Sequence, residues 1–283
     1  ILFDTSGVQL FAEACAQPEY LAARIERAIL DACIGEIAEF VHGDSQYLDL
    51  GCHGVSSAVT LIEHLRPSIY LPVDTSFKAL GSRIAQVSQA YPWLNVCGLH
   101  ARFDEPLHLP RFAGVPVRYK LVSLLGGAFA RYSPAEAGAI LVRLRALAGP
   151  AGRVLVSVDQ TTDWQMLQGA YNDRQGCMAA FNLNALAHLN RELRGDWQPH
   201  RFRHAAVYHK REGFLEMVLE SQFAQFAHVA GRRIDLAPGE RVRTAVHCTH
   251  APQAFLALAQ QAGLRVEKTW SDTHNLIALH CMV

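Results

Sequence analysis

Short apolar segments alternate with amphipathic stretches in the first half of the chain, and this alternation narrows the choice of fold more than any other feature. The apolar segments span residues 47–50, 69–73, 96–99, 120–125 and 154–158. Helical spacing predicts helices over residues 18–40, 58–65, 77–90 and 134–147, the last with Ser133 as N-cap and Glu136 three residues later. Strands that alternate with helices predict an α/β fold with a doubly wound, mostly parallel sheet that binds ligands at the carboxyl ends of its strands.

The alternation stops after Asp159, where a second lobe is predicted. Residues 170–193 have helical character, and residues 202–246 alternate like antiparallel strands, with a hairpin turn at 210–213. A helix over residues 252–262 and strands over 264–269 and 276–282 return to the sheet. We therefore expect residues 1–24, 45–160 and 250–283 to form the sheet domain, and residues 25–44 and 161–249 to form an inserted α+β lobe.

The composition excludes several classes of protein. The 26 Lys and Arg residues balance 26 Asp and Glu residues, so no broad basic surface is available for nucleic acid or anionic lipid. The seven cysteines are an odd number without a CxxC pair, which argues against a disulfide framework. No apolar run approaches the roughly 20 residues of a spanning helix. We expect a soluble, cytoplasmic protein with a small-molecule partner.

The turn after the first predicted strand indicates a nucleotide-type cofactor. Gly51 follows the apolar strand, and Asp74 closes the next one. Glycine allows a ligand to approach the backbone, and a strand-end acid accepts both ribose hydroxyls. His53 stands at the second glycine of a GxGxxG fingerprint, which favours an adenosine cofactor without a pyrophosphate. An ordinary turn glycine and strand-end acid would give the same pattern.

Two longer strings of residues are more specific. The N-terminal string is Phe3-Asp4-x-x-Gly7-x-x-Leu10-Phe11, followed by Pro18-Glu19-Tyr20 and Glu26-x-x-Ile29-Leu30. The central string is Ala170-Tyr171-Asn172-Asp173-x-x-Gly176-x-x-Ala179-Ala180-Phe181-Asn182-x-Asn184, with Asn190-Arg191-Glu192-Leu193, Phe202-x-His204 and Glu216-Met217 after it. Together they resemble the histidine-specific N-alpha-methyltransferases of ergothioneine biosynthesis over nearly the whole chain. The resemblance implies a Rossmann-type methyltransferase domain, a substrate-binding lobe and S-adenosylmethionine (SAM) as cofactor.

The resemblance assigns five residues to the cofactor. Gly51 and Asp74 match cofactor contacts of the family, with Asp74 on the ribose, and Phe103 matches an adenine contact. Arg102 replaces an acid that accepts from the adenine amine, which Arg is unable to do. Ser57 replaces a Lys near the methionine end of the cofactor.

The resemblance assigns seven residues to the substrate. Tyr20, Tyr171 and Met217 match pocket residues of the family. The other four differ from the family: Phe3 replaces a Tyr, Arg131 an Asn that grips the amino acid backbone, and Ala245 and His247 the acid and serine that bind the imidazole ring.

These changes indicate a different substrate. Without the acid and the serine nothing evident pairs with an imidazole, whereas Arg131 suits a carboxylate and His247 a polar group. We expect a SAM-dependent N-methyltransferase for an amino acid or similar small amine other than histidine, in which Tyr20, Tyr171 or a water helps the amine to lose its proton. The alternatives are a non-catalytic binding or assembly protein and a histidine methyltransferase with a rearranged pocket.

Histidine and cysteine patterns raise two further hypotheses. The spacings of His247 with His250 and of His200 with His204 would suit a pair of metal ligands, but no Cys or acid completes either set, and we expect no metal site. Cys52 lies in the cofactor turn beside His53, and we expect no nucleophilic role for it. His53 and His100 are interpreted as loop or strand-end residues near the cofactor.

Overall fold

The computed structural model describes residues 1–41, 44–51 and 57–283, and within them the chain forms two compact units. The sheet unit comprises Ala22–Thr162 and Thr249–Val283, and the lobe unit comprises Ile1–Leu21 and Asp163–Cys248. Each unit is described by itself below. Among the described residues, no helix has the length and hydrophobicity that a membrane span requires.

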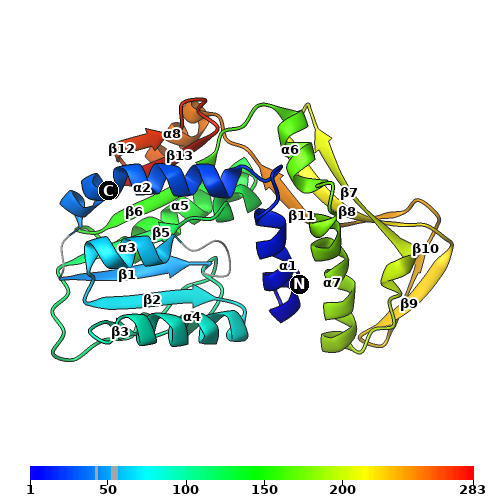
Figure 1. Cartoon of the computed structure of the whole chain (residues 1–283), viewed down its shortest axis with the longest axis horizontal. Coiled ribbons are helices and arrows are strands. Elements are labelled where there is room, and N and C mark those ends of the chain that lie inside the picture. Colours follow the sequence, from blue (N-terminus) through cyan, green and yellow to red (C-terminus); the bar gives the residue numbers. More distant parts are fainter. Residues whose placement is uncertain (42–43, 52–56) are drawn as a thin grey trace. The chain divides into compact units, whose positions relative to one another are not determined.

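The sheet unit is built on a mostly parallel sheet (Figure 1). Its strands run in the order β12-β13-β6-β5-β1-β2-β3, and β4 also pairs with β2. Strands β12 and β13 are antiparallel to their neighbours, whereas β1 to β6 pair in parallel. The bounds are β1 Ser45–Leu50, β2 Ile69–Asp74, β3 Asn95–Val96, β4 Leu99–His100, β5 Tyr119–Leu124, β6 Arg153–Asp159, β12 Val266–Ser271 and β13 Ile277–Met282.

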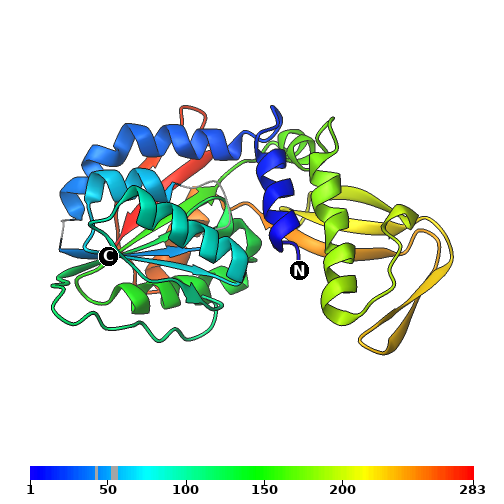
Figure 2. The same cartoon turned by 60° about the horizontal axis from the view of Figure 1, so that its bottom comes forward.

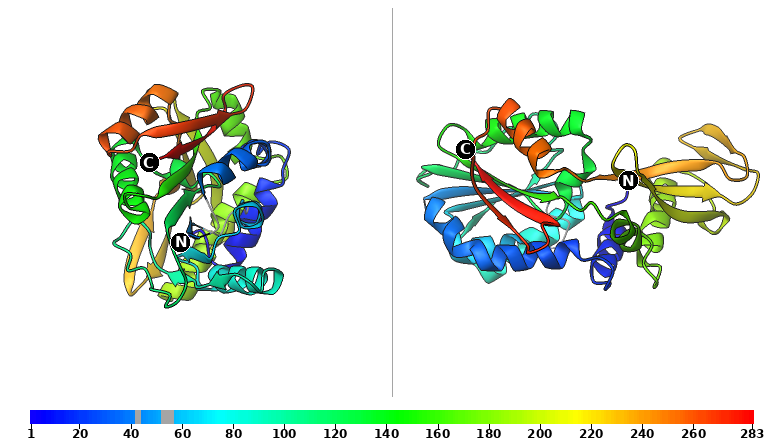
Figure 3. Two further views of the ribbon diagram at one scale, coloured as in Figure 1. Left: turned by 90° about the vertical axis from the view of Figure 1, so that its left-hand side faces the viewer. Right: turned by 90° about the horizontal axis from the view of Figure 1, so that it is seen from above.

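Helices cover both faces of this sheet, as the right-hand view of Figure 3 shows. On one face, α5 (Pro134–Ala148) and α8 (Pro252–Gln261) pack on side chains such as Leu48 and Val122. On the other, α2 (Ala22–Phe40), α3 (Ala58–Leu65) and part of α4 (Phe77–Ala90) pack on Tyr47 and Leu121. Successive strand residues therefore belong to different cores, which confirms the predicted doubly wound α/β fold.

Most predicted elements of the sheet unit are confirmed. Helices α3 and α4 have the predicted bounds, and the carboxylate of Glu136 accepts from the backbone N (3.0 Å) and the hydroxyl (2.6 Å) of Ser133 at the start of α5. The predicted strand at 96–99 is instead two short strands, β3 and β4, which both pair with β2.

The lobe unit combines helices with two antiparallel sheets. The strands β11-β8-β7 form one sheet and β10-β9 the other. The bounds are α1 Thr5–Cys15, α6 Trp164–Tyr171, α7 Cys177–Leu193, β7 Phe202–His209, β8 Phe214–Ser221, β9 Gln225–Val229, β10 Arg232–Leu236 and β11 Arg241–Cys248. The lobe unit also contains a short 3-10 turn, η2 Pro199–Arg201. A second 3-10 turn, η1 Ala128–Arg131, belongs to the sheet unit. The predicted α+β lobe and its hairpin at 210–213 are confirmed.

The predicted helix over residues 170–193 is two helices, α6 and α7. The carboxylate of Asp173 accepts from Cys177 N at 2.8 Å and Met178 N at 2.7 Å, so it caps the first turn of α7. Gly176 precedes α7 with φ of +73°, a conformation that favours glycine. These two residues of the family-like string therefore interrupt the helix.

Helix α1 was not predicted, and it lies along α7 (Figure 2). Its N-cap Asp4 accepts from Gly7 N at 2.7 Å and from the side-chain amide of Asn184 at 2.6 Å, and it forms an ion pair with Arg191. A Cβ atom on Gly7 would lie 1.8 Å from the carbonyl oxygen of Leu2. The two family-like strings thus meet at one contact between α1 and α7.

The structure assigns the two N-terminal segments differently from the predicted domains. Residues 1–21 belong to the lobe unit and residues 22–41 to the sheet unit, the reverse of the assignments predicted for residues 1–24 and 25–44. The physical reason is packing: α1 buries its apolar face on α7, whereas α2 lies against α3 and β13. The predicted lobe boundaries at 161 and 249 lie within two residues of Asp163 and Cys248.

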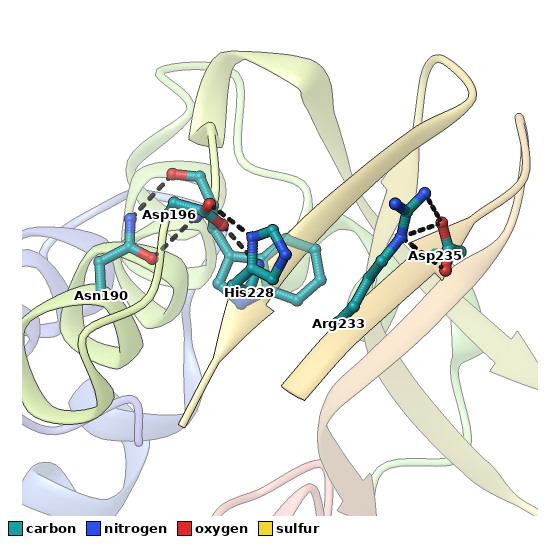
Figure 4. A network of polar contacts seen from close by, with 6 residues as sticks. Asn190, Asp196, His228, Arg233 and Asp235 are labelled. Carbon is teal, nitrogen blue, oxygen red and sulfur yellow. Dashed lines mark hydrogen bonds and ion pairs between the residues drawn. The ribbon is translucent and has the colours of Figure 1, made fainter. Parts of the chain in front are cut away.

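Polar contacts fix the small sheet of the lobe (Figure 4). The side chain of Asn190 accepts from Trp197 N at 2.9 Å and donates to Trp197 O at 2.8 Å. Asp196 accepts from the backbone N of His228 at 2.5 Å. Arg233 pairs with Asp235 at 2.7 Å. The loop after α7 is thereby attached to β9.

Candidate active site

Gly51 and Asp74 lie together at the carboxyl edge of the parallel strands. Gly51 follows β1 with φ of +74°, and its N donates to Val73 O at 2.9 Å. Asp74 ends β2, is 1 % exposed, and accepts from Ser76 N at 2.8 Å through Oδ1. A glycine turn beside a strand-end carboxylate is the arrangement that binds the ribose of an adenosine cofactor. Residues 52–56, including Cys52 and His53, lie outside the described residues.

A buried polar network lies in the strands just before this edge. The sequence alone did not predict it. Asp49 accepts from the Tyr70 hydroxyl at 2.7 Å and from the Ser123 hydroxyl at 3.4 Å, and Tyr47 and Ser123 share a 2.9 Å hydrogen bond. Burial raises the pKa of Asp49, although the hydrogen bond from Tyr70 lowers it. The network joins β1, β2 and β5 just before the cofactor turn.

Phe103 and Arg102 follow β4 and differ in their surroundings. Phe103 packs on the core and lies 6.5 Å from the ring of Tyr132, edge to face. Burial raises the pKa of Tyr132 to about 12. Arg102 is 60 % exposed and pairs with Asp104 at 2.5 Å and Glu105 at 3.0 Å. Its guanidinium group is therefore held by neighbouring acids in the described structure.

Ser57 precedes α3 and is buried. Its hydroxyl donates to Glu26 Oε1 at 3.1 Å. Glu26 belongs to the N-terminal family-like string, but its residue type and position alone did not indicate a role. The sequence feature that could have pointed to Glu26 is an acid on the apolar face of a predicted helix. An acid is rarely buried there unless it has hydrogen-bond partners.

Three of the predicted substrate residues form an aromatic cluster in the lobe unit. The rings of Tyr20 and Tyr171 lie 6.0 Å apart, and the rings of Tyr171 and His247 lie 5.2 Å apart. The Tyr171 hydroxyl is 2.7 Å from Nδ1 of His247. Tyr20 and His247 are each 6 % exposed. The hydrogen-bonded pair of Tyr171 and His247 therefore lies beside the ring of Tyr20.

Strand pairing places Met217 and Ala245 opposite each other. Ala245 on β11 pairs with Met217 on β8, next to a register shift at Thr244. The Thr244 hydroxyl contacts both Asn182 Oδ1 (2.5 Å) and Met217 O (3.0 Å). Since alternate residues of a strand share a face, Ala245 and His247 lie on the same side of β11. Met217 is buried.

His204 orients the backbone of Tyr171, a role that its place in the family-like string did not indicate. Its Nδ1 lies 2.9 Å from the Asn182 side-chain amide, and its Nε2 lies 2.8 Å from Tyr171 O. Burial lowers the pKa of His204, which favours the neutral ring. With Asn182 donating to Nδ1, the Nε2–H group donates to Tyr171 O.

Phe3 and Arg131 complete the predicted substrate set but lie in different units. The Phe3 ring packs 5.3 Å from Phe11, whose ring is 6.1 Å from Tyr20, so Phe3 extends the aromatic cluster. Arg131 ends the turn η1 of the sheet unit and is exposed. Six of the seven predicted substrate residues therefore belong to the lobe unit, and all five predicted cofactor residues belong to the sheet unit.

The histidine pairs do not form metal sites in the part of the chain that is described, where no group of three His, Cys, Asp or Glu side chains is arranged for a metal ion. His250 lies in the sheet unit, 5.0 Å from the ring of Phe129, whereas His247 lies in the lobe unit. His100 lies at the end of β4, with Nε2 3.0 Å from Thr75 O.

The chain is a SAM-dependent methyltransferase by its family match, and its fold agrees with this class. Magnesium protoporphyrin IX methyltransferase from Synechocystis PCC 6803, solved with bound SAH, has the same fold, with a TM-score of 0.51 at 12 % identity over 99 % of this chain and 94 % of that one. The positive-φ glycine and the buried Asp74 fit the adenosine part of SAM.

More particularly, the chain belongs to the family described as histidine-specific methyltransferase, SAM-dependent, which it matches over residues 1–283. It is 31 % identical to histidine N-alpha-methyltransferase of Mycolicibacterium smegmatis (95 % of this chain, 84 % of that protein). It is also 25 % identical to 4-dimethylallyltryptophan N-methyltransferase easF of Epichloe festucae var. lolii (96 % and 86 %). The family membership favours an enzyme over the non-catalytic alternative.

Proposed function

We propose that this enzyme transfers a methyl group from SAM to the amino group of an amino acid, or a similar small amine, other than histidine. One observation carries the proposal: the Tyr171 hydroxyl lies 2.7 Å from Nδ1 of His247, two residues from Ala245 on the same strand. The family resemblance implies an acid and a serine for imidazole recognition at Ala245 and His247.

The two replaced residues argue against an imidazole substrate. The methyl group of Ala245 accepts no hydrogen bond, so the N–H of a substrate imidazole loses the carboxylate partner that the family supplies. A site that depends on such a bond discriminates strongly when it is missing. The His247 ring also occupies space against Tyr171. A substrate with a carboxylate and a smaller or differently polar side chain suits these residues better.

Arg131 is the proposed partner of a substrate carboxylate. Its guanidinium group has the planar fork that binds carboxylates in bidentate fashion. It stands where the resemblance implies an Asn that grips the amino acid backbone, and it is exposed at the end of η1.

Tyr171 is the proposed positioning group for the amine, through a hydrogen bond that its phenolic oxygen accepts. SAM supplies an electrophilic methyl group when bound, and the attacking amine must first lose its proton. When Tyr171 donates to Nδ1 of a neutral His247, its phenolic oxygen is oriented to accept a hydrogen bond from an ammonium group. The carbonyl contact with His204 holds the Tyr171 backbone in place.

A substrate panel tests the proposal. The purified enzyme is incubated with SAM and each of the common amino acids and biogenic amines, and the methylated products are identified by mass spectrometry. We expect at least one amine other than histidine to be methylated with a kcat/KM at least tenfold that of histidine. Histidine as the best substrate would contradict the proposal.

A pair of double variants tests the recognition step. Ala245→Glu with His247→Ser restores an acid and a serine, and Ala245→Gln with His247→Ser is the uncharged control of the same size. A hydrogen bond to a charged group is worth about 1.5–3 kcal/mol, so the Glu variant should methylate histidine about 10–100 times faster than the Gln control. Equal rates in the two variants would refute the recognition argument.

A further inference from the structure

A buried carboxyl group connects three segments near the cofactor edge of the sheet unit. Glu26 lies in the first half of α2 and is 4 % exposed. Both of its oxygens accept from Gly126 N, at 3.0 Å and 2.9 Å, and Oε1 also accepts from the Ser57 hydroxyl at 3.1 Å. The family resemblance places Ser57 near the methionine end of the cofactor, whereas Glu26 has no assigned role.

The glycine pair after β5 forms a concave turn around this carboxyl group. Gly126 and Gly127 have φ of +67° and +71°, so two successive residues adopt the left-handed conformation. Gly126 N donates to both oxygens of Glu26, and the backbone of Gly127 also lowers the pKa of the carboxyl group. Consecutive N–H groups that converge in this way make a site for an anion. Here the acceptor is supplied by another helix of the same unit.

Ser57 and Ser157 extend the contacts to the neighbouring strands. Ser57 stands at the start of α3, after the cofactor turn that begins at Gly51, and Ser157 lies on β6. The Ser157 side chain also lowers the pKa of Glu26. One carboxyl group therefore accepts hydrogen bonds from the segments that follow β1 and β5, and a residue of β6 lowers its pKa.

The burial of Glu26 indicates that these contacts are needed. Desolvation raises the pKa of its carboxyl group, and the hydrogen bonds from Ser157, Gly126, Ser57 and Gly127 lower it. A buried carboxyl group without donors would destabilise the fold. An apolar side chain would fill the same space without the free-energy cost of burying a carboxyl group. We therefore attribute to Glu26 the role of fixing the geometry of the turn.

We propose that Glu26 is a positioning residue for methyl transfer: its carboxyl group fixes the Gly126–Gly127 turn, which leads to Arg131, and the start of α3, which carries Ser57. It holds both in the shape that binds SAM. This inference rests on the SAM site at this edge of the sheet and is independent of which amine accepts the methyl group.

Three variants test it. Glu26→Gln keeps the size of the side chain but turns one acceptor into a donor that faces N–H and O–H groups. Glu36→Gln is the matched control, because Glu36 is exposed on the same helix and pairs with Lys268 at 2.9 Å. Ser157→Ala leaves the carboxyl group in place and removes one donor. For each protein, titration calorimetry gives the Kd of SAM, hydrogen exchange reports on residues 119–131, and thermal unfolding gives the Tm.

We expect Glu26→Gln to raise the Kd of SAM at least tenfold and to speed exchange in residues 119–131, with a Tm within a few degrees of Glu36→Gln, which binds SAM like the wild type. A Kd within twofold of the wild type in folded Glu26→Gln would overturn the proposal and leave Glu26 a purely structural group. If Glu26→Gln does not fold, Ser157→Ala decides: a threefold or larger rise in Kd supports the proposal, and a smaller one overturns it. The substrate panel is unaffected by either result.

Discussion

His280 should lower the free energy of unfolding as the pH falls, and replacing it by Asn should remove most of this pH dependence. His280 lies on β13 and is 2 % exposed, and its ring stacks on Phe255 at 4.4 Å. Nδ1 lies 2.9 Å from the Thr269 hydroxyl, whereas Nε2 has no hydrogen-bond partner among the described residues. A proton on this ring would thus place an uncompensated charge in the core.

The structure sets the size and the sign of the effect. Burial lowers the pKa of His280 from 6.5 to about 4. In the unfolded chain the ring takes up its proton near pH 6.5, so between pH 6.5 and pH 4 the unfolded state binds more protons than the folded state. Stability that is present at pH 7 is therefore lost as the pH falls through this window, and the loss is about 3 kcal/mol.

The assay is urea unfolding followed by circular dichroism at pH values from 4 to 7.5. His280→Asn loses ring packing at every pH, but it takes up no proton in this range. The difference in unfolding free energy between the wild type and the variant should thus shrink by about 3 kcal/mol from pH 7 to pH 4. Burial raises the pKa values of Glu26 and Asp49, which act with the opposite sign but equally in both proteins.

A matched control separates this effect from a general loss of histidine. His274 is exposed in the turn between β12 and β13, and His274→Asn should leave the pH dependence of unfolding as in the wild type. If the difference for His280→Asn changes by less than about 1 kcal/mol over the range, the argument from the buried charge is refuted.

Two further predictions concern the cofactor edge. Asp74→Asn should raise the Kd of SAM about 10–100-fold by calorimetry, because it weakens charged hydrogen bonds worth about 1.5–3 kcal/mol; a change of less than twofold would remove Asp74 from the site. Arg102→Ala should change that Kd by less than threefold, because the guanidinium group is 60 % exposed and already pairs with Asp104 and Glu105. A tenfold rise would show instead that Arg102 contacts the cofactor.

The sequence predicted the sheet unit well because its signals are local. The helices over 58–65 and 77–90 have periodic apolar faces, and the capping residues of α5 lie three positions apart, so neighbouring residues contain the information. The turn glycine and the strand-end acid could be placed together, because parallel strands bring their carboxyl ends to one edge. Gly51 and Asp74 do lie there.

Other elements depend on distant residues, and the sequence alone did not predict them. Helix α1 is fixed by Asp4, whose partners Asn184 and Arg191 are far along the chain. The helix predicted over 170–193 is interrupted because the carboxylate of Asp173 caps the start of α7. The assignment of residues 1–21 and 22–41 to their units depended on whether each helix packs on α7 or on the large sheet.

The candidate site divides in the same way. The sequence by itself determined the class of chemistry, because the residue types at Gly51, Asp74, Tyr20 and Tyr171 and the two family-like strings are visible without a fold. Only the tertiary structure decided that Tyr171 meets His247, 76 residues away, and that Glu26 meets Gly126, 100 residues away. Hydrogen bonds depend on distance and angle, and only the packing of the helices on the sheets sets these for residues so far apart in sequence.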